Sequence, residues 1–510
     1  MEHHQAGRLD QAEQLYREAL GAHPGWLGAL NNLGNILQAR GRLAEAEKVY
    51  REALAMEPDF AEALFNLGAT LNSLGRRDEA RACYEQVLVL LIGMGDALAR
   101  EGKEAEAIEF YQRALDMRPD HVEVLVQAGV LLDSQGRHEE AVQYLRRALK
   151  ARPGDADAAY NLGIVLHGLG EYAAAVDSYD TARRAAPERG DAALGRALSL
   201  LTMGDYVRGF QAYEARHKGG FEKTAMTAPD FAFPMWRGEP LAGKRILLVG
   251  EQGFGDQIQF IRYASVLARQ GAAVDVAADA RLHRLFANAA GVRKVQTAVA
   301  RRSADYDFWS LLLSLPLHLG TTADTVPAEV PYLRPPEEDV KKWAARLRGL
   351  PPERRRVGLV WIAASNPGLE RKHGRSMPFE ALAPLARVAN ASFIGLQFGA
   401  PAGEGAAAAG FPALNLGAEI GDFADNAALL ANLDLLVTVD TAAGHLAGAL
   451  GIPAWIMLPA TPDWRWMRGR ADSPWYPTVK LLRQEKRGEW APVIERVARD
   501  LGLIESRPRG

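Results

Sequence analysis

The segment Ala46-Glu-Lys-Val-Tyr50-Arg-Glu-Ala53-Leu-Ala-Met-Glu-Pro58 recurs along the first part of the 510-residue chain. Its first alanine returns every 34 residues, apart from one spacing of 27, as Ala12, Ala46, Ala80, Ala107, Ala141 and Ala175. In each unit but the third, a proline stands twelve residues after this alanine and ends a helix, because proline lacks the backbone N–H donor. The spacing predicts an array of helix pairs over residues 1–218.

A 34-residue period with small residues at fixed positions resembles the tetratricopeptide repeat. The resemblance implies a helical superhelix whose concave face binds a peptide or protein. One position on the first helix of several units carries an amide that can hydrogen-bond a peptide backbone: Asn32, Asn66, Gln127 and Asn161. A similar asparagine ladder lines the repeats of the protein O-GlcNAc transferases, so we take these four as acceptor-binding candidates. The alternative is that the amides only tighten packing between repeats.

The short spacing of 27 residues falls where the chain reads Val87-Leu-Val-Leu-Leu-Ile92-Gly93, without a helix breaker before Gly93. We therefore expect a fused or distorted helix pair there. This apolar run is far shorter than the ~18 residues that would indicate a membrane span, so no span is expected.

Composition limits the class of protein. Apolar residues make up 48% and charged residues 24%, as in soluble, well-packed proteins. The 60 basic and 63 acidic residues give a net charge of −3, which argues against a nucleic-acid partner. Cys83 is the one cysteine, so an internal disulfide is excluded. Residues 1–5 lack the features of a signal peptide, so a cytoplasmic protein is expected, and a homo-oligomer stays open.

The pattern changes after a proline-containing connector, residues 219–243. Short apolar runs then alternate with helical patterns in two sets, which predicts two α/β lobes, residues 244–340 and 355–510. The expected strands are residues 244–249, 273–277, 292–295, 307–313, 357–361, 392–396, 435–439 and 454–458. Such lobes bind ligands at the carboxyl ends of parallel strands, so a cleft between them is the expected site.

The first motif is Gly250-Glu-Gln-Gly253-Phe-Gly255-Asp256-Gln257, which follows a strand and opens a helix. Glycines permit close approach of a ligand, so Gly253, Gly255 and Gln257 are donor-binding candidates. Asp256 either caps the helix or takes a proton from a substrate hydroxyl, and both roles are compatible. The order GxxGxG differs from the dinucleotide fingerprint, but Asp275 leaves nicotinamide dinucleotide binding open.

Two further motifs point to an anion. In Asp440-Thr441-Ala442-Ala443-Gly444-His445, a strand again leads into a helix whose unpaired N–H groups suit a diphosphate. The basic stretch from Arg371 through Lys372 to Arg375 suits phosphate contact, unless it is only a solvated loop. Asp305-Tyr-Asp307 resembles a metal-binding DxD motif, but it enters an apolar strand and is interpreted as structural. The spacing of residues predicts no metal site.

Together, Gly253-Phe-Gly255-Asp256, Arg375-Ser-Met-Pro378 and Asp440-Thr-Ala-Ala-Gly-His445 resemble the ADP-heptose transferases (family 9) of the GT-B fold, which has two Rossmann-like lobes. More closely, the chain resembles bacterial proteins that join tetratricopeptide repeats to such a domain, a plan shared with the protein O-GlcNAc transferases. The resemblance implies Asp256 as general base, Arg375 as a contact of the donor diphosphate, and Gln397 and Glu404 as contacts near the donor nucleoside.

The position of the tryptophans near the C-terminus, just past the strand that follows the Asp440 motif, yields a further prediction. Trp464 and Trp466 are expected near the cleft, where they stack on sugar or base, or else pack within the lobe. The last helix, which starts at Trp490, is expected to pack back on the first lobe, as it often does in GT-B folds.

The sequence therefore predicts a metal-independent hexosyl- or heptosyltransferase without a resident cofactor. A nucleotide diphosphate sugar serves as co-substrate, and the acceptor is a hydroxyl of a protein or peptide held by the repeats. The alternative is a non-catalytic repeat scaffold whose α/β region senses a nucleotide or is degenerate.

Overall fold

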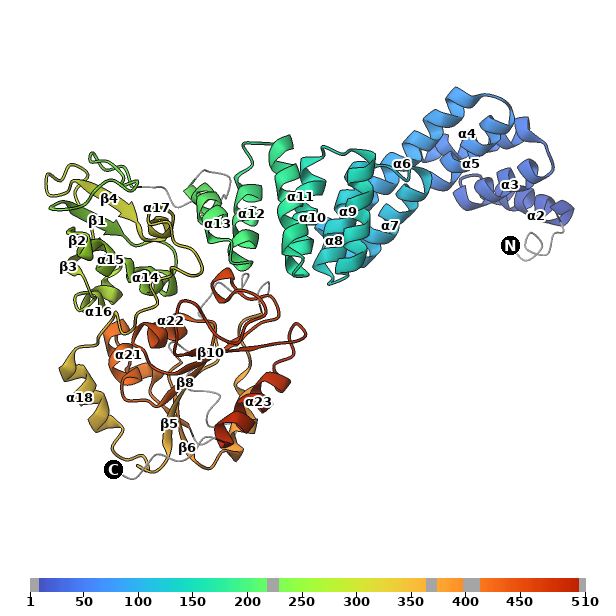
Figure 1. The fold of residues 1–510 in the computed structure, drawn as a ribbon. Helices are drawn as coiled ribbons and strands as arrows, with labels where there is room; N and C mark the ends of the chain where they lie inside the picture. Colours follow the sequence, from blue (N-terminus) through green and yellow to red (C-terminus); the bar gives the residue numbers. More distant parts are fainter. Residues whose placement is uncertain (1–8, 218–228, 364–373, 398–412, 504–510) are drawn as a thin grey trace. The chain divides into compact units, whose positions relative to one another are not determined.

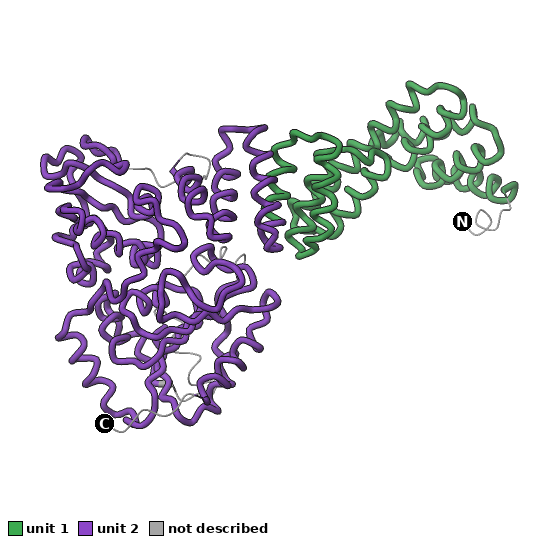
Figure 2. Tube along the Cα trace, viewed as in Figure 1, with its two compact units in different colours: residues 1–165 green, residues 166–510 purple. Residues whose placement is uncertain are grey.

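The computed structural model describes residues 9–217, 229–363, 374–397 and 413–503 (Figure 1). The chain divides into two compact units, residues 1–165 and 166–510 (Figure 2). The division falls inside a helix of the repeat array, so the last repeats belong to the second unit.

Paired helices form the N-terminal part of the chain, as the period predicts. They are α2 (Leu9–Ala22), α3 (Leu27–Ala39), α4 (Leu43–Met56), α5 (Ala61–Ser73), α6 (Arg77–Arg100), α7 (Glu104–Met117), α8 (Val122–Ser134), α9 (His138–Ala151), α10 (Ala156–Gly168), α11 (Tyr172–Ala185), α12 (Gly190–Thr202) and α13 (Tyr206–Tyr213). The short 3-10 helix η1 (Glu214–His217) follows.

Small residues let the two helices of a repeat approach each other. A Cβ atom added at Gly34 would lie 2.4 Å from the Tyr50 ring, and Gly68 stands in the same relation to Tyr84. The turn between the helices needs a left-handed residue, and glycine takes this conformation without a Cβ clash. These turn glycines, with φ between +73° and +85°, are Gly41, Gly75, Gly102, Gly136, Gly170 and Gly204.

The short spacing between repeats produces one continuous helix, α6, of 24 residues, which confirms the expected fusion. Gly95 within α6 packs against Tyr111 as Gly34 does against Tyr50, so the repeat register resumes there. Among the described helices, α6 is long and apolar enough to cross a membrane by length and composition alone. Its residues Cys83, Val87 and Leu91 are buried, and α6 packs against α5 and α7, so these features do not establish a span.

The second unit contains two parallel sheets in the part of the chain that the structure describes. The first has four strands in the order β3-β2-β1-β4, and the second has six in the order β10-β9-β8-β5-β6-β7. The strands are β1 (Arg245–Val249), β2 (Ala273–Ala277), β3 (Val292–Gln296), β4 (Phe308–Leu311), β5 (Arg355–Val360), β6 (Ala391–Gly395), β7 (Ala413–Asn415), β8 (Leu435–Val439), β9 (Ala454–Leu458) and β10 (Val479–Arg483). Parallel pairing throughout confirms the alternating α/β prediction.

The helices that accompany the two sheets are short. They include α14 (Phe254–Phe260), α15 (Tyr263–Arg269), α16 (His283–Phe286), α17 (Leu315–His318), α18 (Glu337–Arg346), the 3-10 helix η4 (Phe379–Arg387), α21 (Phe423–Leu430), α22 (Ala442–Ala449), the 3-10 turn η7 (Trp464–Trp466) and α23 (Ala491–Gly502). The expected return of the last helix to the first lobe is wrong: α23 packs against η4, and its apolar residues, such as Ile494 and Val497, join the core beside β5 and β8.

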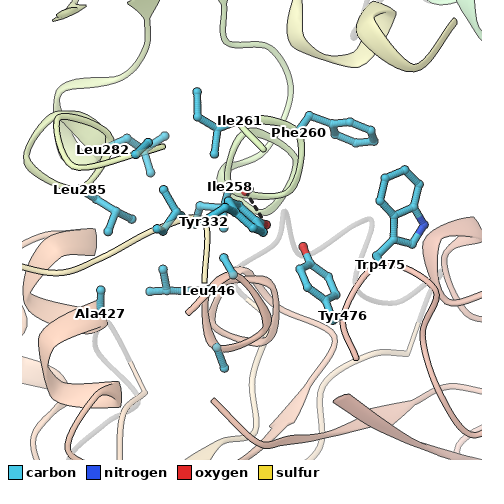
Figure 3. Close-up of a cluster of buried hydrophobic side chains, with 14 of the residues drawn as sticks. Ile258, Phe260, Ile261, Leu282, Leu285, Tyr332, Ala427, Leu446, Trp475 and Tyr476 are labelled. Atoms are coloured by element: carbon cyan, nitrogen blue, oxygen red, sulfur yellow. Dashed lines mark hydrogen bonds between the residues drawn. The ribbon is translucent and has the colours of Figure 1, made fainter. Parts of the chain in front are cut away.

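A continuous apolar core joins the two sheets. Ile258 of α14, Ala427 of α21 and Leu446 of α22 meet there, and the Tyr332 hydroxyl donates to the Ile258 carbonyl oxygen at 3.0 Å (Figure 3). The buried guanidinium of Arg262 donates to the Tyr332 hydroxyl and to the Trp475 carbonyl oxygen. It also lies 4.5 Å from the Tyr332 ring centre and 4.7 Å from that of Tyr476. This cation is therefore shared between the segments that carry the two sheets.

The last repeat is part of the same core. Tyr206, Phe210 and Tyr213 of α13 are buried in it, and the Trp475 indole N–H donates to the Tyr206 hydroxyl at 2.9 Å. On the first sheet's side, Arg216 of η1 forms a buried ion pair with Glu251 at 2.9 Å. The second unit thus consists of the end of the array and both sheets in one packed body.

Candidate functional site

Two loops predicted to bind ligand stand at the points where the strand order reverses. In the first sheet the order turns between β1 and β4, and the glycine motif follows β1 directly. In the second sheet it turns between β5 and β8, and the motif that begins with Asp440 follows β8. Ligands of open parallel sheets bind at such points, beyond the carboxyl ends of the strands.

The two loops lie against each other. A Cβ atom at Gly255 of α14 would lie 2.8 Å from the His445 ring and 3.6 Å from the Ala442 Cα atom of α22. Phe254 and Phe423 are also in contact, with ring centres 4.9 Å apart. Where the sequence predicts a cleft, α14 and α22 therefore pack directly, and glycine at 255 permits this approach.

The glycine loop before Asp256 is held in an uncommon conformation. Gln252 has a φ of +58°, a region that residues other than glycine seldom adopt. Its amide and the Tyr213 hydroxyl of the last repeat hydrogen-bond at 3.0 Å. Gln257 packs over Gly250, and its side-chain oxygen is buried without a hydrogen-bond partner among the described residues.

Asp256 bonds to the start of its own helix and also forms an ion pair with a distant arginine. One carboxylate oxygen accepts the backbone N–H of Gly253 at 2.9 Å, which is the predicted cap. The other pairs with the guanidinium of Arg465, and the Asp256 side chain remains 19% exposed. Burial raises the pKa of Asp256, while Arg465 opposes the rise. A carboxylate with a raised pKa is a stronger base, so the site is compatible with proton abstraction.

Asp440 and Arg375 meet at the start of α22. The Arg375 guanidinium lies 3.8 Å from the Asp440 carboxylate, and both Arg375 Nε and Asp440 Oδ2 are buried without a hydrogen-bond partner in the described residues. Burial and the neighbouring Asp463 carboxylate raise the pKa of Asp440, and Arg375 opposes this effect. The Thr441 hydroxyl faces Thr438 at 2.9 Å instead of capping α22. Within the described residues no side chain caps this helix, which leaves its first amides without side-chain competition for an anion.

His445 points inward. Its Nδ1 atom and the Tyr476 hydroxyl hydrogen-bond at 3.0 Å, and its ring stacks on Trp466 with centres 5.0 Å apart. Burial, followed by the charge of Arg465, lowers the pKa of His445 to about 3, so the ring is neutral. These contacts give His445 a packing role, and contact with a donor sugar or phosphate stays a prediction. Gly444 beside it packs on Ile456, where a Cβ would meet the Cδ1 atom at 3.0 Å.

Of the remaining donor-binding candidates, some are described by the structure and some are not. The Gln397 side chain is engaged with backbone at the end of β5, accepting from Ile362 N at 2.9 Å. Lys372 and Glu404 lie outside the described residues. The Ala443 side chain, in the α22 motif, is buried.

Two other expectations concern carboxylates that turn out to be bound by neighbouring side chains. Asp275, considered as a dinucleotide ligand, is buried and bonded to Arg293 and to the Tyr306 hydroxyl, the latter at 2.9 Å. Asp307 binds Lys244 at 3.0 Å and so has the structural role expected. These contacts leave neither carboxylate directed to a ligand.

The tryptophans predicted near the cleft pack inside the protein. Trp464 is 2% exposed and surrounded by the rings of the last repeat, and Trp466 is fully buried on His445. This is the lobe-packing alternative, and stacking of either indole on sugar or base is not what the geometry favours.

In the first unit, two of the four amide residues predicted to bind an acceptor are hydrogen-bonded within the array. The Asn66 amide donates to the Asn31 side chain of the previous repeat at 2.9 Å, and Asn161 donates to the Asp157 carbonyl of its own helix. These bonds favour packing at two positions. Gln127 is exposed and Asn32 half-buried, so acceptor binding there stays a prediction.

Sequence reasoning missed Arg465, Arg216 and Tyr213 as residues of the site. Arg465 stands in the Asp463-Trp-Arg-Trp466 stretch, where two tryptophans and an aspartate flank a cation, but its partner Asp256 is 209 positions away. Glu251 and Gln252 were visible within the glycine motif, yet nothing local indicates that a repeat helix would bind them.

Comparisons with known proteins identify the repeats. The tetratricopeptide repeat family matches residues 26–90, 87–154, 126–187 and 160–218. Protein FlbA of Caulobacter vibrioides is 30% identical over 315 residues, an alignment that covers 55% of this chain and 50% of FlbA. The chain thus spans about half the length of this curated relative.

Solved structures similar to the chain include YrrB, a tetratricopeptide-repeat protein with an unusual peptide-binding site, and PilF of Pseudomonas aeruginosa. YrrB is 23% identical with a TM-score of 0.22, and the match covers 35% of this chain and 95% of YrrB. PilF is 18% identical with a TM-score of 0.24, covering 40% of this chain and 90% of PilF. Scores this low support no functional assignment. The family matches alone show that the N-terminal region, residues 26–218, consists of tetratricopeptide repeats.

Proposed function

We propose that the chain is a GT-B glycosyltransferase that moves a sugar from a nucleotide diphosphate sugar to a hydroxyl of a protein or peptide. The observation that carries the proposal is the contact between two loops, each of which follows a strand at a point where the strand order reverses. The loop after β1 carries Asp256, and the loop after β8 leads into α22, whose N-cap Thr441 makes no side-chain capping bond. A donor and an acceptor hydroxyl need such a pair of loops, one to bind the diphosphate and one to supply a base.

In the proposed reaction Asp256 takes the proton of the acceptor hydroxyl as its oxygen attacks the anomeric carbon. The bond from that carbon to the diphosphate oxygen breaks, and the nucleoside diphosphate leaves. Arg375 and the first amides of α22 stabilise the charge that develops on the leaving group. The proton on Asp256 is then released to water.

The repeats supply the acceptor surface in this proposal. Tetratricopeptide arrays bind peptides and proteins, and the array here continues into the packed body that carries Asp256. An acceptor held by the repeats has its hydroxyl delivered at high effective concentration, which favours a macromolecular over a small-molecule acceptor.

A scaffold function is the second candidate, favoured by one observation. Asp256 is already paired with Arg465, and His445 is neutral, buried and hydrogen-bonded to Tyr476, so these two side chains have partners without a ligand. In a scaffold the repeats bind partners and the sheets have a structural role.

A panel of UDP-, GDP- and ADP-linked sugars separates the two candidates. The proposal expects one donor class to raise the melting temperature of the full-length protein, and expects slow hydrolysis of that donor without acceptor. Both effects should persist with a chelator present, because charge stabilisation is assigned to Arg375 and backbone amides. If no nucleotide sugar stabilises the protein or is hydrolysed, the scaffold candidate stands. If both effects vanish with the chelator, the metal-independent mechanism is wrong.

A further inference from the structure

Arg465 is a buried cation between two carboxylates from different parts of the chain. Its guanidinium pairs with Asp256, next to the first sheet, and with Asp463 at 2.8 Å in its own turn. The residue is 5% exposed, and its Nε atom has no hydrogen-bond partner among the described residues. A cation in this position orients the Asp256 carboxylate and also stabilises its charged form.

The turn that carries Arg465 is held by the last repeat. The Trp464 ring lies 5.6 Å from the Phe210 ring and 6.2 Å from the Tyr206 ring, both at near-perpendicular angles. The Arg465 guanidinium lies 4.4 Å from the Trp464 ring centre, so the indole that packs on α13 also covers the cation. Side chains of the repeat thus determine where Arg465 stands.

The other side of the pair is held by the same repeat. Arg216 of η1 binds the buried Glu251 carboxylate, and Tyr213 of α13 binds the Gln252 side chain. Gln252 precedes Asp256 by four residues, so these contacts hold the loop that leads to Asp256. Both members of the Asp256–Arg465 pair therefore rest on one structural element, the segment from α13 to η1.

We propose that Arg465 is the positioning residue for Asp256. We also propose that the last repeat takes part in catalysis, because it holds Arg465 and Asp256 in position relative to each other. The proposal rests on the function proposed above, in which Asp256 takes the acceptor proton. It assigns the final repeat to catalysis, in addition to the acceptor binding expected of the array.

The charges around Asp256 define the expected effect of losing Arg465. Burial raises the pKa of the Asp256 carboxyl, and the charges of Asp463, in the turn that carries Arg465, and of Glu251, in the glycine loop, raise it further. The hydrogen bond from the Gly253 amide lowers this pKa. Tyr213 of α13 also faces the group, and the ring of His445 on α22, which packs on Gly255, is neutral. Arg465 is thus the cation that offsets burial at this carboxyl.

The test compares Arg465→Gln and Arg465→Lys in the full-length protein with Arg470→Gln as matched control. Arg470 lies five residues away and pairs with the exposed Asp472, not with Asp256. Carboxyl carbons of labelled aspartate are followed by NMR against pH, and the signal lost in Asp256→Asn assigns the resonance. We expect Arg465→Gln to move the Asp256 midpoint upward by about one pH unit or more, Arg465→Lys by less, and Arg470→Gln not at all.

Turnover gives a second, independent reading of the same group. Arg465→Gln should lower kcat at neutral pH by roughly 10- to 100-fold with donor KM within about threefold, because the loss concerns base and alignment rather than donor binding. Its acid limb should move to higher pH, so raising the pH recovers part of the rate. Arg465→Lys should recover part of the rate at neutral pH.

Two results would overturn the proposal. One is an unchanged Asp256 midpoint in a folded Arg465→Gln protein, and the other is a kcat loss with no movement of the pH profile. If Arg465→Gln fails to fold, Arg465→Lys is judged by the same measurements. A parent protein that turns over no nucleotide sugar contradicts the proposed function instead, and the NMR midpoint then decides by itself whether Arg465 controls Asp256.

Discussion

The indole N–H of Trp475 donates to the hydroxyl of Tyr206 at 2.9 Å, and both residues are buried. Tyr206 begins the last repeat helix, whereas Trp475 stands just before β10 of the second sheet. The end of the array is thus joined to the sheets by a buried hydrogen bond as well as by ring contacts.

Tyr206→Phe should destabilise the second unit. The substitution keeps the ring but leaves the Trp475 N–H buried without its acceptor, which costs about 1–3 kcal/mol in the free energy of unfolding. Tryptophan fluorescence in a denaturant titration reports this unit selectively, since nine of the ten tryptophans follow residue 165. Tyr144→Phe, in the first unit, is the control. Equal stability of Tyr206→Phe and parent would mean that the hydrogen bond contributes nothing.

His445 should make the second unit sensitive to acid. Its pKa is lowered to about 3 in the folded protein, mainly by burial, whereas an unfolded histidine titrates near 6.5. The unfolded state therefore binds the extra proton first, and the free energy of unfolding falls by up to about 1.4 kcal/mol per pH unit as pH drops below ~6.5. His445→Gln should flatten this slope between pH 6.5 and 4.5, and the exposed His23→Gln should not. Parallel slopes in the parent and His445→Gln would exclude this origin.

Asp256→Asn should separate capping from catalysis. The asparagine oxygen can still accept a hydrogen bond, but the charged pair with Arg465 is lost, so we expect a stability loss of about 1–3 kcal/mol. If Asp256 is the general base, turnover falls by roughly 10²–10⁴-fold while donor affinity barely changes. Asp422→Asn is the matched control because Asp422 caps α21 through the Asp425 N–H. Turnover within about threefold of the parent would rule out the catalytic role.

Removal of residues 1–155 should abolish transfer to a macromolecular acceptor and leave donor binding intact. The cut is placed before α10 because Gly168 and Gly170 accept hydrogen bonds from Thr461 and Arg468 of the second unit. We expect macromolecular transfer to fall by roughly tenfold or more, equivalent to ~1.4 kcal/mol of acceptor binding, while donor hydrolysis is unchanged. A truncated protein that modifies the acceptor as well as the parent would contradict this assignment.

Much of the fold could be predicted from the sequence because local patterns determine it. The strands over residues 273–277, 435–439 and 454–458 begin and end where their apolar runs do. The continuous α6 follows from the missing proline turn. By contrast, α18, which begins just after Pro336, and β10 are absent from the predicted elements.

The helix that the glycine motif opens ends early, at Phe260, for a reason that depends on tertiary structure. Residues 256–269 have a helical pattern, but the Arg262 side chain donates to the Gln259 carbonyl oxygen, the acceptor that a continuous helix would offer to Tyr263. That side chain is drawn inward by Tyr332 and Trp475, both distant in sequence.

The candidate site was predicted in its parts and not in its arrangement. Asp256, Arg375 and Asp440 stand out through glycine loops and charge patterns, which are local signals. The pairing of Asp256 with Arg465 and the packing of Gly255 on His445 join segments about 200 residues apart, and no local pattern encodes such contacts.

The surroundings of Arg262 have a consequence for how acid acts on the two sheets. Its partners are aromatic rings, a phenol and carbonyl oxygens, none of which gains or loses a proton between pH 4 and 8. The attachment at Asp256, in contrast, depends on a carboxylate that acid neutralises. Acidification therefore weakens the contact between the two sheets at Asp256 and leaves the contacts around Arg262 intact. We expect the sheets to separate first on the side of Asp256, while they stay joined at Arg262.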